Sequence, residues 1–179
     1  FVRPVRWCLL LIGNNIIETE ILDCKTSNQT YGHRFHAPNA ITIDKPSDYE
    51  NILQETGYVV VNYQKRKQLI RDAIEQQAKQ LNTQLLIDED LLDEVTSINE
   101  WPVALTGEFD TEYLQLPKEV LIASMQDHQK YFPVMNSSGE LLANFITFAN
   151  IDSHNIDSVR KGNERVLSPR LNDAKFFFQ

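Results

Sequence analysis

The chain has 179 residues, of which 42% are hydrophobic, and it carries a formal net charge of −8. This length and composition suffice for one folded domain, or for one domain with an appended helical part. The longest apolar run, residues 7–12, is too short for a bilayer-spanning helix, which excludes membrane insertion. The acidic balance excludes a protein that coats a polyanion over its whole surface.

The first third of the sequence predicts strands separated by turns. Gly-Asn, Ser-Asn and Pro-Asn pairs bound the strand-like runs, which are residues 5–12, 15–22, 29–35 and 41–44. We expect these strands to form a meander. If the first two pair through Gly13 and Asn14, Cys8 faces Thr19 and lies too far from Cys24 for a disulfide. Both thiols are therefore expected to be reduced, as in the cytosol.

Helical patterns follow. Pro46 begins a short helix that continues to about residue 55, and Gly57 ends it. Residues 63–81 form an amphipathic helix that we expect to pack on the sheet. Its apolar positions are Tyr63, Ile70, Ala73, Ile74, Ala78 and Leu81. Acidic residues 88–90 complement the helix dipole at the start of a helix over residues 91–98.

The second half alternates strands and helices. Residues 101–105 predict a strand, Pro117 begins a helix over residues 120–128, and a hairpin pairs residues 131–135 with 141–150. A helix runs from about residue 156 to the end, and Pro169 is expected to divide it because proline cannot donate into a helix interior.

These elements predict an α/β or α+β body with a mixed sheet and packed helices, followed by a C-terminal helical extension. The expected domains are residues 1–154 and a basic helical segment at residues 155–179. Because the chain lacks an initiating Met and both ends lack caps, we expect an internal piece of a longer protein.

Catalytic and metal-binding patterns are not apparent. A strand would point His33 and His36, three residues apart, to opposite faces as exposed imidazoles, and no ligand pair completes a zinc site. No nucleophile elbow, phosphate-binding loop or dinucleotide fingerprint occurs, so we predict neither a catalytic residue nor a cofactor in this chain. His128 shares a helical stripe with Leu121 and Met125 and is interpreted as the end of a buried face, with substrate contact as the alternative.

Positive charge is concentrated in a few short segments of the sequence. Five cations at helical spacing lie within residues 160–178, whereas residues 46–116 hold fourteen acids against five cations. Gly32-His33-Arg34-Phe35 combines a glycine for close backbone approach, a cation and an aromatic ring, which suits a phosphate or a stacked base; a plain surface loop is the alternative. Lys65-Arg66-Lys67 is interpreted as a solvated helix face, with RNA contact as its alternative.

Six ordered motifs cover nearly the whole chain. They are Arg3-Pro4-Val5-Arg6-Trp7, Thr30-x-Gly32-His33-Arg34-Phe35, Glu100-Trp101-Pro102-Val103, Leu116-Pro117-Lys118-Glu119-Val120-Leu121, Tyr131-Phe132-Pro133-Val134 and Gly162-Asn163-Glu164-Arg165-Val166-Leu167. Together they closely resemble the beta subunit of bacterial glycyl-tRNA synthetase.

The resemblance implies a cytoplasmic class II aminoacyl-tRNA synthetase, a heterotetramer of two alpha and two beta subunits. In that family the alpha subunit carries the adenylation site with ATP and Mg, and the beta subunit supplies most tRNA contacts. The region corresponding to this chain is similar in fold to the editing domain of the phenylalanyl-tRNA synthetase beta subunit and binds the acceptor arm of glycine tRNA. The candidate RNA-binding residues are His33, Arg34, His128, Lys130, Arg160, Lys161, Arg165 and Arg170.

Two other functions stay open at this stage. An editing site could hydrolyse mischarged tRNA, with His33 or His128 orienting a water molecule, although no base paired with a carboxylate is recognisable. The segment could instead be structural, with Arg165 paired to Glu164 or Asp173. The apolar triplet at residues 176–178 favours some packing role in either case.

Overall fold

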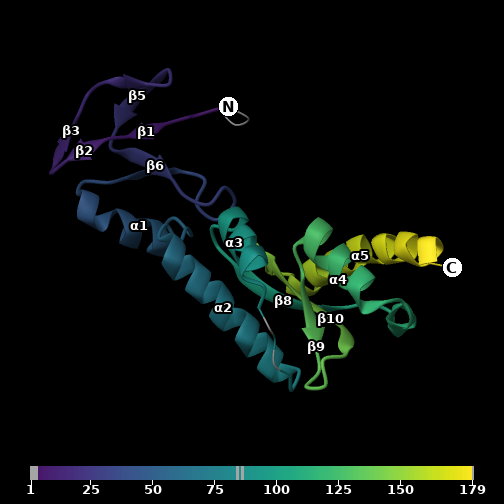
Figure 1. Cartoon of the computed structure of the whole chain (residues 1–179). Helices are drawn as coiled ribbons and strands as arrows, with labels where there is room; N and C mark the ends of the chain where they lie inside the picture. Colours follow the sequence, from purple (N-terminus) through teal and green to yellow (C-terminus); the bar gives the residue numbers. More distant parts are fainter. Residues whose placement is uncertain (1–3, 84, 86, 179) are drawn as a thin grey trace. The chain divides into compact units, whose positions relative to one another are not determined.

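The computed structural model describes residues 4–178 except 84 and 86, so Arg3 of the first motif lies outside the described residues. The chain divides into two compact units, Phe1–Asn62 and Tyr63–Gln179 (Figure 1). We refer to them as the first and second units. None of the helices in the described part of the chain combines the length and apolar character that a bilayer crossing requires.

The first unit is built from short strands and one small helix. A three-stranded sheet pairs β1 (Cys8–Leu9) with β5 (Cys24–Ser27) in parallel and β5 with β4 (Glu20–Ile21) in antiparallel fashion. Two antiparallel pairs join β2 (Leu11–Ile12) to β3 (Asn15–Ile16) and β6 (Gln29–Tyr31) to β7 (Ala40–Thr42). The 3-10 turn η1 (Pro46–Asp48) leads into α1 (Tyr49–Glu55), as predicted.

The predicted meander is wrong beyond its first turn, where β2 and β3 do pair across Gly13 and Asn14 as expected, and Thr26 supplies the reason. Its hydroxyl donates to the Ile17 carbonyl at 2.6 Å and accepts from the Thr19 amide at 2.8 Å, while its own amide donates to the Thr19 carbonyl. These bonds attach residues 17–19 to β5, so Cys8 lies opposite Thr26 rather than Thr19. Cys8 and Cys24 are free cysteines in this structure, and their reduced state stays a prediction.

The second unit has three layers. Its sheet has the order β8 (Val103–Glu108), β10 (Leu141–Ala149), β9 (Phe132–Met135), and both pairings are antiparallel. Figure 1 shows these strands between two pairs of helices. One pair is α2 (Tyr63–Gln80) and α3 (Glu89–Ile98), and the other is α4 (Lys118–Gln129) and α5 (Ile156–Phe178). The 3-10 turn η2 (Thr111–Gln115) precedes α4.

Adjacent residues of β10 separate the two cores of this unit. Phe145 packs with the apolar side chains of α4 and α5, whereas Ile146 packs with those of α2 and α3. Successive strand residues point to opposite faces, so both faces of β10 are buried under helices. The predicted packing of the helix at residues 63–81 on the sheet is confirmed by Ile70 and Ile74, which are fully buried.

A glycine makes room for the largest buried side chain of the sheet. Gly107 lies directly opposite Phe145 in the register of β8 and β10. A β-carbon on Gly107 would lie 2.3 Å from the Phe145 ring. The Phe145 ring also stacks on Tyr131, with centroids 4.6 Å apart and planes 8° from parallel. A side chain at residue 107 would therefore displace this stack.

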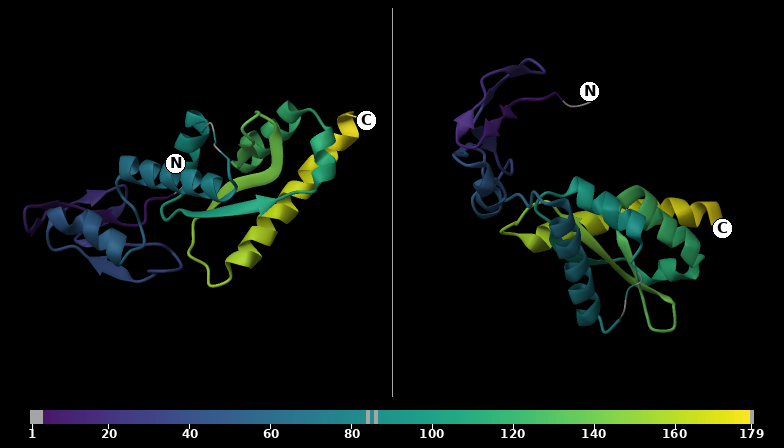
Figure 2. Two further views of the ribbon diagram at one scale, coloured as in Figure 1. Left: turned by 90° about the horizontal axis from the view of Figure 1, so that it is seen from below. Right: turned by 60° about the vertical axis from the view of Figure 1, so that its left-hand side comes forward.

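The expected division at Pro169 is also wrong, because α5 is one continuous helix that contains Pro169 (Figure 2). Leu167 and Leu171 on either side of the proline are fully buried. The Ser168 hydroxyl donates to the Glu164 carbonyl at 3.0 Å. Tertiary packing thus overrides the lost backbone hydrogen bond, whose cost is of the order of 3 kcal/mol.

The mixed α/β fold class with a long C-terminal helix is confirmed. The strand predicted over residues 29–35 ends at Tyr31, and β5 was not predicted. The expected domain boundary at residues 154/155 stays a prediction, although α5 packs within the second unit through the apolar core that it shares with α4 and β10.

Candidate nucleic-acid interface

The candidate site in the first unit starts at a tight turn after β6. Gly32 passes so close to Gly57 that a β-carbon on Gly32 would lie 2.4 Å from the Gly57 carbonyl oxygen. The His33 amide donates to the same oxygen at 2.6 Å. The close backbone approach predicted for Gly32 is therefore an approach to the protein's own chain, and it ends the strand.

His33 organises this turn. Its side chain is only 2% exposed, and its Nδ1 accepts hydrogen bonds from the backbone amides of Phe35 and His36, each at 3.3 Å. The prediction of exposed imidazoles on opposite faces is wrong, because the rings of His33 and His36 lie 4.7 Å apart. His33 thus fixes the backbone from which Arg34 projects.

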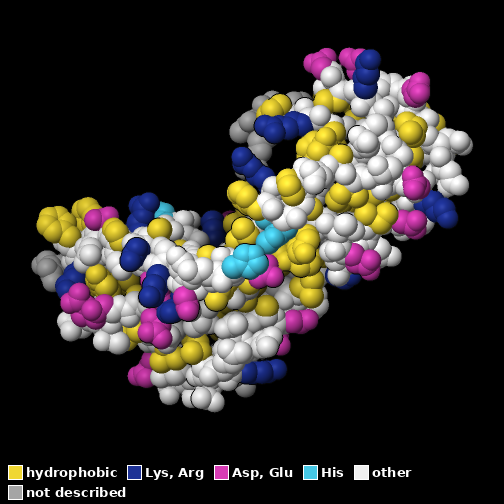
Figure 3. Space-filling model, turned by 180° about the vertical axis from the view of Figure 1, so that it is seen from behind, with side chains coloured by type: hydrophobic (Ala, Val, Ile, Leu, Met, Phe, Trp, Pro, Cys, Tyr) yellow, Lys and Arg dark blue, Asp and Glu magenta, His cyan; other side chains and the backbone are white. Residues whose placement is uncertain are grey.

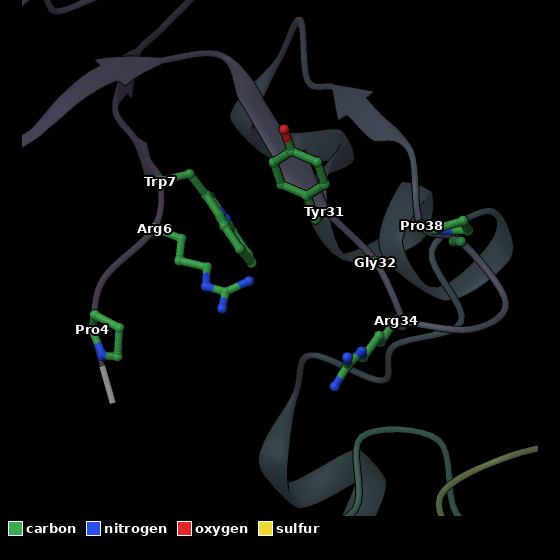
Figure 4. Close-up of a pocket in the computed structure, with 8 residues that line it drawn as sticks. Pro4, Arg6, Trp7, Tyr31, Gly32, Arg34 and Pro38 are labelled. Atoms are coloured by element: carbon green, nitrogen blue, oxygen red, sulfur yellow. The ribbon is translucent and has the colours of Figure 1, made fainter. Parts of the chain in front are cut away.

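Arg34 lines an open groove of about 830 Å³ in the first unit, which we call the arginine groove (Figure 4). Its lining residues are Pro4, Arg6, Trp7, Tyr31, Gly32, Arg34, Ala37 and Pro38. Figure 4 shows Arg6 and Arg34 extending from opposite sides toward the space between them. The rings of Trp7 and Tyr31 have centroids 4.8 Å apart and planes inclined by 55°.

The charged residues that line the arginine groove are all positive. No acidic residue is among its lining residues. Within the part of the chain that the structure describes, neither Arg6 nor Arg34 forms an ion pair, and the Arg34 guanidinium lies 5.7 Å from the centroid of the Phe35 ring. Unpaired guanidinium groups beside exposed aromatic rings suit an anion that also carries a planar apolar group.

The cations of α5 in the second unit differ in their ion pairs, their exposure and their position around the helix. Arg160 is engaged by Glu164 at 3.1 Å and by Asp157 at 3.4 Å, and these carboxylates, Glu164 first, raise the pKa of its guanidinium. Lys161 and Arg165 are exposed and lie one turn apart. Arg170 is exposed too but lies about 140° around the helix axis from Arg165.

Two further candidates lie at the end of α4. His128 is exposed in the last turn, so its interpretation as the end of a buried face is wrong, although Leu121 and Met125 are buried as expected. Lys130 adopts a left-handed conformation with φ of 58° and forms an ion pair with Glu94. Lys130 therefore links α4 to α3.

The basic run at residues 65–67 also joins helices. Lys67 pairs with Asp93 at 2.6 Å and with Glu89 at 3.3 Å, and the Arg66 Nε donates to the Thr96 carbonyl at 3.0 Å. The hydrogen bond from Lys67 is the main reason that the pKa of Asp93 is lowered. These side chains hold α2 against α3 rather than forming a freely solvated face.

On the face drawn in Figure 3, lysines and arginines are scattered among acidic side chains. Within the described residues, no three His, Cys, Asp or Glu side chains gather closely enough to hold a metal ion. In the arginine groove and at the Lys161–Arg165 pair, cations that form no ion pair among the described residues lie near one another.

Sequence reasoning selected Arg34 but missed its neighbours Arg6, Trp7 and Tyr31. The signal was present, because the first motif alternates arginines with a proline and ends in tryptophan. Its significance depends on a fold that brings residues 4–7 beside residues 31–38, which are more than twenty positions away.

The comparisons with known proteins give a consistent answer. A family profile described as Glycyl-tRNA synthetase beta subunit matches residues 1–179. The Glycine--tRNA ligase beta subunit of Hahella chejuensis is 50% identical over 178 residues, which are 99% of this chain and 26% of that protein. The subunit of the same name from Marinobacter nauticus is 47% identical over 180 residues, covering 100% of this chain and 26% of that protein.

The same description applies to a relative from Acinetobacter baumannii that is 49% identical over 178 residues, with 99% of this chain and 26% of that protein covered. The chain thus spans about a quarter of the length of these relatives. Because the profile matches from the first to the last residue, this chain belongs to the glycyl-tRNA synthetase beta subunit family.

Proposed function

We propose that this chain is part of the tRNA-binding surface of a glycine–tRNA ligase. Glycine activation with ATP and Mg would take place on an alpha subunit, in a heterotetramer of two alpha and two beta subunits in the cytoplasm. The chain would contribute binding and orientation of the tRNA, including its acceptor arm, and no reacting group of its own.

One observation carries this proposal: a member of this family presents unpaired arginines in an acid-free groove on a chain with net charge −8. A protein of this charge repels RNA over most of its surface, so it requires local cations for docking. Arg6 and Arg34 meet this requirement in the first unit, and Lys161 with Arg165 meets it in the second.

The candidate residues differ in how available they are. Arg34, Lys161, Arg165 and Arg170 are exposed and form no ion pair within the described residues, so they can meet phosphates. Arg160 and Lys130 would first have to leave their carboxylate partners. His33 supports the turn beneath Arg34, and His128 stays a candidate on the exposed end of α4.

The test is a kinetic comparison in the full-length alpha–beta enzyme. Arg34→Ala and Arg165→Ala should each raise KM for glycine tRNA, whereas glycine-dependent ATP–pyrophosphate exchange, which needs no tRNA, should keep its rate. Lys25→Ala provides a matched control, since Lys25 is an exposed cation of the first unit that does not line the arginine groove. Unchanged tRNA kinetics in both arginine variants would contradict the proposal.

A structural role for α5 is favoured by separate observations. Glu164 accepts a hydrogen bond from the Glu108 amide at 3.2 Å, and Asn163 accepts one from the Tyr131 hydroxyl at 2.8 Å. Both belong to the motif at residues 162–167. This motif therefore fastens α5 to the sheet with its inner residues while Arg165 faces outward. The Arg165 pairing with Glu164 or Asp173 that a purely structural role would use does not occur among the described residues.

A further inference from the structure

We propose that the arginine groove binds one unpaired nucleotide of RNA, with its base stacked on the Trp7–Tyr31 pair and its phosphate held by Arg6 and Arg34. This inference rests on the proposed tRNA-binding function and deepens it. The ligand assigned to the arginine groove is an unpaired nucleotide. Cations elsewhere on the chain would contact only the phosphates of helical RNA.

The aromatic pair provides the surface for the base. Trp7 is 42% exposed and Tyr31 is 40% exposed, so a substantial part of each ring faces solvent although the rings contact each other. Exposed aromatic rings that flank cations are the usual platform for single-stranded nucleic acid, because every base has a face that can stack.

The arginines provide the site for the phosphate. They approach the groove from separate segments, Arg6 from the chain before β1 and Arg34 from the turn after β6. A guanidinium group can donate two parallel hydrogen bonds to a phosphate, and no carboxylate in the groove lining competes for either arginine. The two residues can therefore hold one phosphate from opposite sides.

The size and rigidity of the groove fit one nucleotide. Its volume of about 830 Å³ lies within the range of roughly 300–1,000 Å³ that is typical of small-molecule sites. The turn that carries Arg34 is fixed by the His33 Nδ1 and by the contact of Gly32 with Gly57. Less side-chain and backbone freedom is then lost on binding.

The geometry favours an unpaired nucleotide over a base pair. In an RNA helix the faces of the bases are covered by their neighbours, so a ring of the protein can stack only on a base that is splayed out or terminal. The Trp7–Tyr31 pair has no use in binding a continuous duplex, for which phosphate contacts alone would suffice.

The test uses the full-length alpha–beta enzyme with a short single-stranded oligoadenylate and a blunt RNA duplex of equal length, both fluorescently labelled. Trp7→Phe keeps an aromatic face and should bind the single strand nearly as well as the wild type. Trp7→Leu keeps apolar bulk without an aromatic face and should lose roughly tenfold in affinity for the single strand. Its affinity for the duplex should not change.

Arg6→Ala with Arg34→Ala should weaken single-strand binding and flatten its salt dependence, whereas the charge-matched pair Lys25→Ala with Lys45→Ala should change neither. Trp7→Leu should leave the salt dependence as it is, since no charge is removed. Photocrosslinking of tRNA bound to the wild-type enzyme should also give a nucleotide adduct on Trp7 or Tyr31. This experiment needs no variant, so its result does not depend on whether the variants fold normally.

Three results would overturn the inference: equal single-strand affinity of Trp7→Phe and Trp7→Leu, no saturable binding of the oligoadenylate, or tighter binding of an acidic peptide than of the oligoadenylate in the same groove. If Arg34→Ala and Arg165→Ala still raise KM for tRNA in that case, the proposed function stands and only the nucleotide site is lost. If neither variant affects tRNA, both fail together.

Discussion

The Tyr131 hydroxyl donates a 2.8 Å hydrogen bond to Oδ1 of Asn163, which connects the residue just before the edge strand β9 to the C-terminal helix α5. Asn163 in turn donates through Nδ2 to the Val159 carbonyl at 2.9 Å. Tyr113 makes the equivalent bond to Asn172 at 2.8 Å, so two tyrosine–asparagine pairs hold α5 at positions nine residues apart. The outward direction of Lys161 and Arg165 is fixed by these bonds.

The first prediction concerns the coupling within this pair. Tyr131→Phe and Asn163→Ala should each lower the free energy of unfolding by about 1 kcal/mol or somewhat more, because each leaves a partly buried polar group without its partner. The double variant should cost less than the sum of the two, with a coupling energy of roughly 0.5–1.5 kcal/mol. Urea unfolding of the four proteins measures this, and strict additivity would show that the bond contributes nothing.

The second prediction is a loss of stability at high pH. Burial raises the pKa of Tyr131 from its ordinary 10.0 to about 12. The folded chain therefore keeps this proton more tightly than the unfolded chain. The resulting stability is fully present below about pH 10 and is lost as the pH rises through 12.

Tyr131→Phe removes this titration. Although the variant is less stable at neutral pH, its stability should fall less steeply between pH 10 and 12 than that of the wild type. Over this pH range the wild type should lose more free energy of unfolding than the variant, by about 1–2 kcal/mol after allowance for solvent screening. Parallel pH curves for the two proteins would mean that Tyr131 ionises without penalty in the folded state.

The third prediction contrasts two glycines. Gly107→Ala should destabilise the chain by roughly 1–3 kcal/mol or more, because its β-carbon would overlap the Phe145 ring in a filled core. Gly162→Ala is the matched control, since nothing lies within 4 Å of its β-carbon position in α5. Alanine is favoured over glycine in a helix interior, so this variant should gain about 0.5–1 kcal/mol. Thermal unfolding distinguishes the two, and a stabilised Gly107→Ala would refute the packing described for the sheet.

The fourth prediction concerns the turn beneath Arg34. His33→Ala would leave the amides of Phe35 and His36 without their acceptor and should cost about 1–3 kcal/mol. His33→Asn retains an oxygen near the position of Nδ1 and should recover part of this loss. Hydrogen exchange of these two amides reports on the turn directly. Equal exchange rates in the wild type and His33→Ala would contradict the role given to the imidazole.

Local patterns were sufficient for the elements of the second unit. The apolar repeat of α2, the proline before α4 and the turn between β9 and β10 each act within a few residues, and each predicted element is present. Pro169 shows the limit of such patterns. The burial of Leu167 and Leu171 in a core shared with α4 keeps α5 continuous.

The first unit was predicted less well because its structure depends on contacts between distant residues. Thr26 binds the 17–19 segment through its hydroxyl, and Gly32 ends its strand against Gly57. The candidate site also depends on contacts between residues that are distant in the sequence. Arg34 stood out within its own motif, whereas Arg6, Trp7 and Tyr31 join it only after the chain has folded.

The most direct test of the account is the salt dependence of glycine tRNA binding by the full-length enzyme. If Arg6 and Arg34 together neutralise one phosphate of an unpaired nucleotide, Arg6→Ala with Arg34→Ala should reduce the slope of log Kd against log salt by about 0.7, the value for one phosphate of a single strand. The slope should stay at the wild-type value in Lys25→Ala with Lys45→Ala. Identical slopes and affinities for all three enzymes would show that the arginine groove does not bind the tRNA.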